Sequence, residues 1–136
     1  MRPTSLRVLT ALAAAKGFKM RRWDFVAAYL QGDLEPGEEN YCSCPPGYEE
    51  TDDLGEAYVY RVNKPVYGMA QAGRRWQRSL FPFLIGLGYT QFGSDPCLFR
   101  KTDIIDGIEH TVLVGVYVDD LAIVYSHDGP TSLYVI

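Results

Sequence analysis

Residues 110–125 read HTVLVGVYVDDLAIVY, and this stretch decides the fold. Two apolar runs flank Asp119 and Asp120, which predicts a β-hairpin (strands at 108–117 and 121–126) with two adjacent carboxylates at its tip. Burying an unpaired carboxylate costs several kcal/mol or keeps it protonated. A divalent cation removes that cost, because Mg²⁺ binds carboxylate oxygens and substrate phosphates. An ordinary polar turn accounts for the pair equally well, since Asp is a common turn residue.

The composition indicates a globular protein with one core. The chain has 136 residues, of which 47% are hydrophobic and 22% are charged, and this suits a single domain. No apolar stretch reaches the roughly 18 residues needed to cross a membrane. Arg7 and Thr10 interrupt the only N-terminal apolar stretch, which is typical of a helix rather than a signal peptide. We therefore expect an intracellular protein, cytoplasmic or nuclear, without a membrane partner.

The charge is unusual for a protein that binds nucleic acid alone. The net charge is -4, whereas such proteins normally present a basic surface. Two local basic clusters could still contact nucleic acid: Lys16, Lys19, Arg21 and Arg22, followed by Arg74, Arg75 and Arg78. Affinity for a phosphate backbone must therefore come largely from outside this chain.

Cysteine usage favours reduced thiols. Cys42, Cys44 and Cys97 form an odd set, which is typical of an intracellular protein. A zinc site would need two further ligands, and His110 and His127 stand at no recognisable spacing from the cysteines.

The remaining pattern predicts an α+β fold with an antiparallel sheet. A helix is expected from Thr4 or Ser5 to residue 15, capped by one of these hydroxyls and ended by Gly17. A second helix is expected at 74–87, where Pro82 should kink it or shift its start. Strands are expected at 19–25, 41–44, 58–62 and 98–101, with a turn or short helix at 26–30.

Asp24 is a further acidic residue in an apolar setting, WDFVAAYL at 23–30. Two-metal phosphoryl transfer needs carboxylates from separate chain segments to hold two cations roughly 4 Å apart. Asp24 and the Asp119–Asp120 pair supply such a set if their strands are neighbours. A helix cap or a surface position is the alternative for Asp24 taken alone.

Four segments in order carry a family resemblance. The first three are DFVAAYLQGDL at 24–34, YCSCPPGY at 41–48 and VYGMAQAGRRW at 66–76. The fourth comprises GY at 88–89, SDPCLF at 94–99 and YVDD at 117–120. Together they resemble the reverse transcriptase of copia-type (long-terminal-repeat) retrotransposons, over residues 6–126. The resemblance implies a partial reverse transcriptase domain at 1–136. Its expected fold is a polymerase palm-like antiparallel sheet packed against helices, with part of the fingers-side connection and with fingers and thumb incomplete.

The resemblance also implies an RNA-directed DNA polymerase with Mg²⁺, or Mn²⁺, as cofactor. Asp24 and Asp119 match the metal-binding aspartates of the palm. Asp120 matches the second member of the hairpin pair, for which the resemblance implies a role in organising the catalytic site and weaker ligation of the metal. Phe25 would lend its backbone carbonyl to the metal. The expected reaction joins a deoxynucleoside triphosphate to the 3′-hydroxyl of a primer.

Other matched positions imply contacts with substrates. Tyr29 would select deoxynucleotides because its ring clashes with a 2′-hydroxyl, although a core aromatic is the alternative. Gln71 would pack on the incoming nucleotide, and Tyr117 would touch the primer terminus. Contacts with template or primer phosphates are implied for Arg74, Arg75 and Arg78. The alternative for any one of these arginines is a solvent-exposed position on the basic face of the helix. Asp33 and Asp95 are interpreted as turn or cap residues.

Departures from the family pattern concern the surroundings of the site. Ala70 replaces the usual lysine, which removes a positive charge near the nucleotide, and Gly73 replaces the usual proline before the Arg74 helix. The implied partners are a primed template, a nucleotide, and the fingers, thumb, RNase H and integrase segments of a longer polyprotein, in a virus-like particle. The alternative function is a truncated, non-catalytic relic or an interaction module.

Overall fold

The computed structural model describes residues 1–126, which divide into two compact units. The sheet unit contains residues 1–28 and 80–126, and the hairpin unit contains residues 29–79. Helix α2 (Ala72–Gly86) begins in the hairpin unit and ends in the sheet unit. No helix among the described residues is long and apolar enough to cross a membrane.

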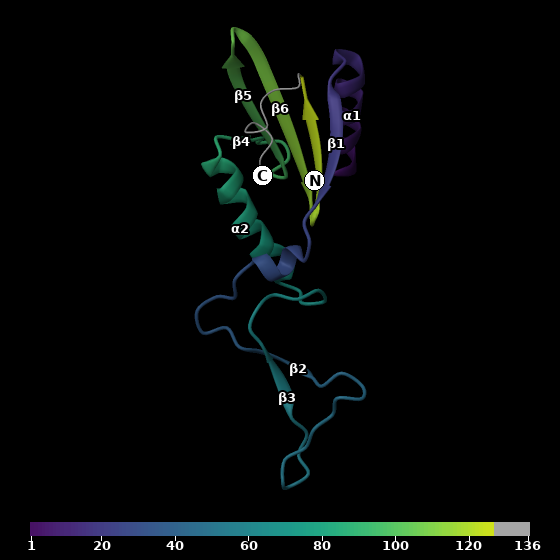
Figure 1. Cartoon of the computed structure of the whole chain (residues 1–136), viewed down its shortest axis with the longest axis vertical. Helices are drawn as coiled ribbons and strands as arrows, with labels where there is room; N and C mark the ends of the chain where they lie inside the picture. The colour runs from purple at the N-terminus through teal and green to yellow at the C-terminus, as the bar shows by residue number, and fades with distance from the viewer. Residues whose placement is uncertain (127–136) are drawn as a thin grey trace. The chain divides into compact units, whose positions relative to one another are not determined.

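The sheet unit is built on a five-stranded antiparallel sheet in the order β1-β7-β6-β5-β4 (Figure 1). Its strands are β1 (Lys19–Asp24), β4 (Thr90–Gln91), β5 (Leu98–Ile105), β6 (Ile108–Tyr117) and β7 (Asp120–Tyr125). The predicted α+β class with an antiparallel sheet is confirmed. β1, the first strand of the chain, lies at one edge of the sheet beside β7, the last strand. Because the two strands are antiparallel, the end of β1 lies next to the start of β7.

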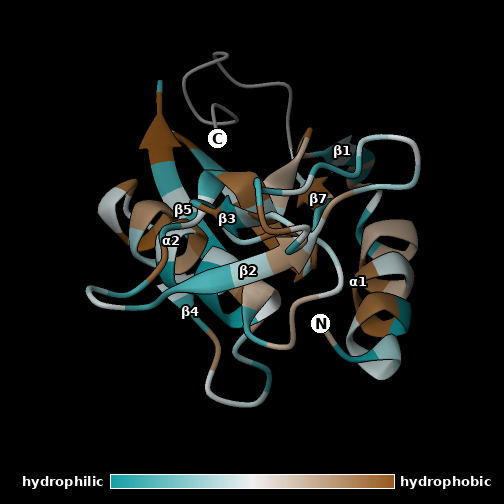
Figure 2. Ribbon diagram, turned by 90° about the horizontal axis from the view of Figure 1, so that it is seen from below, coloured by the Kyte–Doolittle hydropathy of each residue, from teal (hydrophilic) through white to brown (hydrophobic). Residues whose placement is uncertain are grey.

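Strand register assigns residues to the two faces of this sheet. Leu113 pairs with Val124 and packs with Leu9 and Ala13 of helix α1 (Pro3–Lys16), so α1 covers that face. Neighbouring residues in a strand point to opposite faces. Phe99 therefore lies on the other face, where its ring centroid is 5.1 Å from that of Phe81 in α2. In Figure 2, the α1 ribbon carries both hydrophobic and hydrophilic residues.

Helix α1 begins differently from the prediction. Neither Thr4 nor Ser5 caps it: the N-cap residue is Arg2, whose side chain makes no cap hydrogen bond. The carboxylate of Asp95 takes that role, because it accepts hydrogen bonds from the Arg2 N–H (2.8 Å) and the Ser5 hydroxyl (2.6 Å). The prediction of Asp95 as a turn or cap residue is thus confirmed, since it also accepts a hydrogen bond from the Cys97 N–H two residues on (3.0 Å). The ending of α1 at left-handed Gly17 (φ 66°) is confirmed as well.

Two elements of the sheet unit extend beyond their predicted bounds. β5 continues to Ile105 and forms a hairpin with β6 through a two-residue turn, Asp106-Gly107, whose φ angles are both positive. Asp-Gly is a strong signal for this type of turn, and the sequence analysis overlooked it. Helix α2 starts at Ala72, two residues before the predicted start, and continues through Pro82 to Gly86. The proline, which is exposed, therefore does not shift the start of the helix toward the C-terminus.

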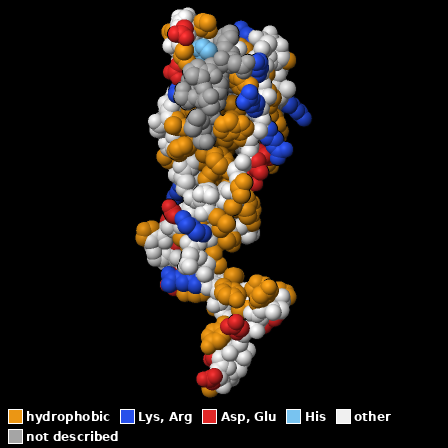
Figure 3. All heavy atoms as spheres, viewed as in Figure 1, with side chains coloured by type: hydrophobic (Ala, Val, Ile, Leu, Met, Phe, Trp, Pro, Cys, Tyr) orange, Lys and Arg blue, Asp and Glu red, His pale blue; other side chains and the backbone are white. Residues whose placement is uncertain are grey.

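The hairpin unit holds a two-stranded antiparallel sheet of β2 (Asn40–Ser43) and β3 (Val59–Val62). A short 3-10 helix, η1 (Ala28–Gln31), precedes it and confirms the turn or short helix predicted at 26–30, shifted by one or two residues. Several large apolar side chains of this unit are exposed, among them Tyr41, Tyr48, Leu54, Tyr58 and Val59. Figure 3 shows hydrophobic and acidic side chains on the surface of this part of the chain.

Candidate functional site

The predicted hairpin tip is present, and its turn is strained. Tyr117 pairs with Asp120 across β6 and β7, which leaves Val118 and Asp119 as the two turn residues. Val118 has φ 57°. A β-branched residue at positive φ is a genuine outlier that costs about 1–3 kcal/mol. Such strain tends to persist where the position of a neighbouring side chain matters.

The structure brings Asp24 to the same strand ends. Asp24 is the residue on β1 that pairs with Asp120 on β7, so their side chains share a face of the sheet. The next residue, Phe25, donates its backbone N–H to the carbonyl oxygen of Asp119 at 2.9 Å. Residues Asp24, Asp119 and Asp120, which come from two segments far apart in sequence, thus lie at the neighbouring ends of β1 and β7. This is the condition on which the predicted acidic site depended.

Arg22 is a residue of this site that the sequence analysis did not identify. Its Nε and Nη2 atoms both lie 2.7 Å from Oδ1 of Asp120. The hydrogen bond and charge of Asp120 raise the pKa of Arg22, and the charges of Asp24 and Asp119 add to the effect. Arg22 stands two residues before Asp24, hence on the same face of β1. That spacing was the available signal, but Arg22 was counted only as part of a basic cluster.

The oxygen atoms at the site are suitable ligands for a hard divalent cation, but the side chains do not form a preorganised metal-binding site. Carboxylate and backbone carbonyl oxygens are the ligands that Mg²⁺ prefers, and Asp24, Asp119 and the Phe25 carbonyl supply them. Within residues 1–126, however, no three His, Cys, Asp or Glu side chains gather closely enough to hold a metal ion. One oxygen of Asp120 is instead engaged by Arg22.

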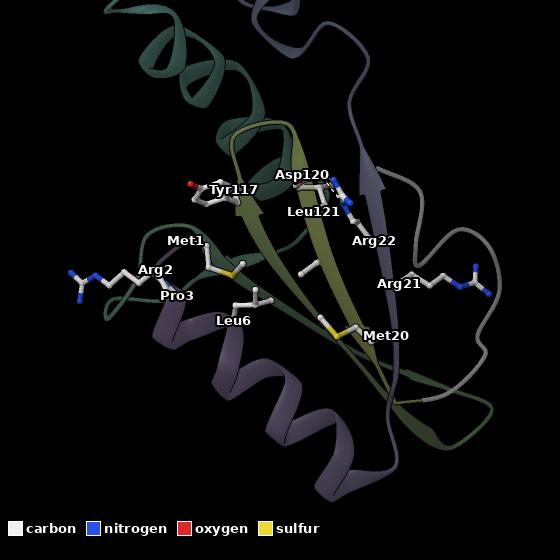
Figure 4. A pocket seen from close by; sticks show the side chains of 11 residues that line it. Met1, Arg2, Pro3, Leu6, Met20, Arg21, Arg22, Tyr117, Asp120 and Leu121 are labelled. Carbon is white, nitrogen blue, oxygen red and sulfur yellow. Dashed lines mark hydrogen bonds and ion pairs between the residues drawn. The ribbon is translucent and has the colours of Figure 1, made fainter.

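A groove of about 570 Å³ in the sheet unit includes one of these aspartates, Asp120, in its lining. It is lined by residues from the start of α1, from β1 and from the β6–β7 tip, including Met1, Leu6, Met20, Tyr117, Asp120 and Leu121. Figure 4 shows Met1, Leu6 and Met20 between the helix and the strands, with Arg22 directed at Asp120. Tyr117, which was predicted to touch the primer, is 58% exposed at the rim of this groove.

The residues predicted to meet the nucleotide belong to the hairpin unit. Tyr29 is half-buried, and its ring centroid lies 4.3 Å from that of Tyr67. Gln71 donates hydrogen bonds from Nε2 to Glu38 (2.8 Å) and to Asn40 (3.4 Å). The backbone N–H of Glu35 and the amides of Gln71 and Asn40 lower the pKa of Glu38 to about 2. Glu38 thus holds Gln71 in this structure.

The three arginines of α2 differ from one another. Arg75 is largely buried and forms ion pairs with Glu35 and, at 2.8 Å, with Glu38. Arg78 is more exposed and also pairs with Glu35. Arg74 is exposed. The described ion pairs therefore engage two of the three side chains that were predicted to contact phosphates, a feature that sequence reasoning missed because Glu35 and Glu38 lie in a distant loop.

The zinc alternative gains no support from the structure. Cys42 is exposed, and Cys44 and Cys97 are partly buried free thiols. The Cys44 thiol donates a hydrogen bond to the Tyr58 carbonyl. His110 is buried in the sheet unit, and His127 lies outside the described residues.

Comparisons with known proteins identify the family of the chain. The family model of reverse transcriptase (RNA-dependent DNA polymerase) matches residues 1–130. The chain is 33% identical over 93% of its length to the Retrovirus-related Pol polyprotein from transposon TNT 1-94 of Nicotiana tabacum, and 33% identical over 90% to that from transposon RE2 of Arabidopsis thaliana. A truncated transposon Ty1-A Gag-Pol polyprotein of Saccharomyces cerevisiae is 27% identical over 91%.

The chain spans only 9%, 8% and 9% of the lengths of these three relatives. No solved structure matches it. The family match covers nearly the whole chain, so the chain belongs to the reverse transcriptase family found in retrotransposon Pol polyproteins.

Proposed function

From this family membership, we propose that the chain is the catalytic core of an RNA-directed DNA polymerase, equivalent to part of a polymerase palm. The observation that carries the proposal is the pairing of Asp24 with Asp120 at the strand ends, beside the Phe25–Asp119 backbone hydrogen bond. Two adjacent strand ends present carboxylates on one face, and nucleotidyl transfer needs carboxylates from at least two segments.

In this proposal Asp24, Asp119 and the Phe25 carbonyl hold Mg²⁺ or Mn²⁺, and Asp120 organises the site and is a weaker ligand of the cation. When bound, the cations activate the 3′-hydroxyl of the primer and stabilise the charge that develops on the triphosphate. The contribution of the chain is to fix its oxygen donors on rigid strand ends. The strained turn at Val118 fits this role, because it sets the direction of the Asp119 side chain.

The substrate contacts are proposed from the family match. Tyr29 excludes a 2′-hydroxyl, Gln71 packs against the nucleotide, and Tyr117 contacts the primer terminus at the rim of the groove. Gln71 must then exchange its hydrogen bond to Glu38 for the nucleotide. Phosphate contacts are proposed for Arg74 first, because it is exposed, and for Arg75 and Arg78 after release from Glu35.

The whole enzyme is proposed to be a longer polyprotein. The chain spans less than a tenth of its relatives, so the fingers, thumb, RNase H and integrase segments are proposed to be supplied by the remaining sequence. The primed template would be gripped mainly by those segments, which agrees with the net charge of -4. The proposed location is the cytoplasm, within a virus-like particle, or the nucleus.

Metal binding and primer extension test the proposal together. We expect the 136-residue chain to bind Mn²⁺ weakly, and Asp24→Asn and Asp119→Asn each to weaken binding at least roughly tenfold, since each removes a charged ligand. Asp53→Asn, in the exposed acidic loop, is the matched control and should leave binding unchanged. Extension of a primed RNA template by this chain alone should be slow or absent.

The alternative, a non-catalytic relic or interaction module, rests on one observation. No three ligand side chains are gathered for a metal within the described part of the chain. Mn²⁺ binding that is insensitive to both aspartate variants would favour this alternative and contradict the polymerase proposal. Robust extension abolished by Asp119→Asn would instead show that the fragment is more complete than proposed.

A further inference from the structure

Arg22 is placed on the sheet so that its charge meets the acidic strand ends. On β1 it pairs with Ala122, and Asp120 stands two residues before Ala122 on the same face of β7. Arg22 and Asp120 are therefore diagonal neighbours across two hydrogen-bonded strands, which is within reach of a long side chain. Figure 4 shows the guanidinium of Arg22 turned toward Asp120, whereas Arg21 points away from the site.

The contact concentrates two donors on one carboxylate oxygen. Nε and Nη2 both approach Oδ1 of Asp120 at 2.7 Å, and the charges of Asp24 and Asp119 also act on the guanidinium. The Arg22 side chain is 76% exposed, so it contributes little packing. An ion pair this exposed also adds little to stability. The main effect of Arg22 is therefore electrostatic: it neutralises part of an acidic cluster.

A guanidinium in this place must compete with a divalent cation. Mg²⁺ and Mn²⁺ bind carboxylate oxygens, and the Asp120 oxygen that Arg22 occupies is one of them. Arginine stays protonated in proteins, so its charge cannot be removed by losing a proton. A cation that enters the site must therefore displace the side chain or bind beside its positive charge.

We propose that Arg22 is a counter-ion of Asp120 that competes with the divalent cation for this carboxylate, and that this competition sets the metal affinity of the site. This proposal rests on the proposed function, because it assumes that the three aspartates are the metal site. Arg22 is a positioning residue, since it acts through Asp120. The contact that carries the proposal is the ion pair between Arg22 and Asp120, at 2.7 Å.

Direct titration with Mn²⁺, followed by electron paramagnetic resonance, tests the proposal on the 136-residue chain. We expect Arg22→Gln to bind Mn²⁺ roughly threefold to tenfold more tightly than the wild type, because a repelling charge a few ångströms away is removed. Arg22→Lys retains the charge and should stay within about twofold of the wild type. Arg21→Gln is the matched control for loss of one arginine on the same strand and should leave the affinity unchanged.

Thermal unfolding gives a second readout that needs no added substrate. In EDTA, Arg22→Gln should melt close to the wild type, because so exposed an ion pair adds little to stability. At a fixed, subsaturating concentration of Mn²⁺, Arg22→Gln should gain more thermal stability than the wild type, since tighter binding of the cation to the folded state stabilises that state more. Unchanged or weaker Mn²⁺ binding by Arg22→Gln would overturn the proposal.

The two hypotheses fail in different ways. Asp119→Asn should abolish the gain in affinity when it is combined with Arg22→Gln, and a gain that survives in the double variant would refute the role of Arg22 at this site. If Asp119→Asn weakens Mn²⁺ binding while Arg22→Gln leaves it unchanged, the metal site of the proposed function is supported and the role of Arg22 as its counter-ion is refuted. If Asp119→Asn has no effect, the proposed metal site itself is wrong.

Discussion

Replacing Asp95 by asparagine should destabilise the sheet unit by an amount that depends on pH. Asp95 is only 4% exposed. Its carboxylate accepts hydrogen bonds from the Arg2 N–H (2.8 Å), the Ser5 hydroxyl (2.6 Å) and the Cys97 N–H (3.0 Å). It thereby joins the start of α1 to the start of β5. Asparagine keeps the shape but loses the charge that strengthens all three bonds.

The pKa of Asp95 gives the size of this effect. Burial alone would raise that pKa, but the three hydrogen bonds and the N-terminal ammonium outweigh burial and lower it from 3.8 to about 2. A group with a lowered pKa stabilises the fold above its unfolded pKa and loses that contribution as the pH falls through the folded value. The contribution is therefore about 2 kcal/mol at pH 7, roughly half of that at pH 3, and close to zero below pH 2.

Urea unfolding followed by circular dichroism measures the effect. At pH 7, Asp95→Asn should lower the free energy of unfolding by about 2 kcal/mol. The difference between wild type and variant should shrink to about 1 kcal/mol at pH 3. Asp53→Asn, an exposed acidic residue, should stay within about 0.5 kcal/mol of the wild type at both pH values. A gap between wild type and Asp95→Asn that is equal at pH 7 and pH 3 would refute the reasoning.

Two further substitutions probe the core and the turn. A Cβ on Gly115 would stand 3.1 Å from Cδ1 of Leu9 and 3.3 Å from Cδ2 of Leu98, and it would also displace the flexible Met1 side chain. Gly115→Ala should therefore lower the free energy of unfolding by about 1 kcal/mol. Gly93→Ala, with no atom within 4 Å of its added Cβ, is the control, and equal effects of the two variants in urea unfolding would contradict this packing. Val118→Gly should leave stability unchanged or raise it by up to about 1 kcal/mol, because glycine tolerates positive φ. Val8→Gly, at an exposed position in α1, should destabilise by about 0.5 kcal/mol, since valine is itself a poor helix former. A comparable or larger loss for Val118→Gly in thermal unfolding would exclude strain at the turn.

Local pattern was enough to predict the central elements of the fold. The strand at 108–117 matches β6 in both bounds, and Gly17 ends α1 as its left-handed conformation requires. Both depend on interactions between residues close in sequence, namely apolar runs and backbone freedom. The ordered motifs also identified the family, which the family match over residues 1–130 confirms. The roles of Asp24, Tyr29 and Gln71 remain predictions.

Long-range pairing decided the remaining features, and the sequence carried little signal for it. The cap of α1 comes from Asp95, 93 positions from Arg2, whereas a local rule pointed to Thr4 or Ser5. The partners of Arg75 lie in a loop about 40 residues earlier in the chain. A hydrogen bond between distant segments depends on the register of the strands or helices that bring them together, and residue identity alone does not reveal that register.

The hairpin that presents Asp119 and Asp120 could be predicted from residue order alone, because two short apolar runs on either side of a polar pair favour paired strands. Only the tertiary structure decided that β1 pairs with β7, and thus that Asp24 lies opposite Asp120. The same register places Arg22 diagonally across from Asp120 and makes it the counter-ion of the acidic site. The physical reason is that strand pairing fixes which side chains share a face, and this depends on contacts between segments that are far apart in the chain.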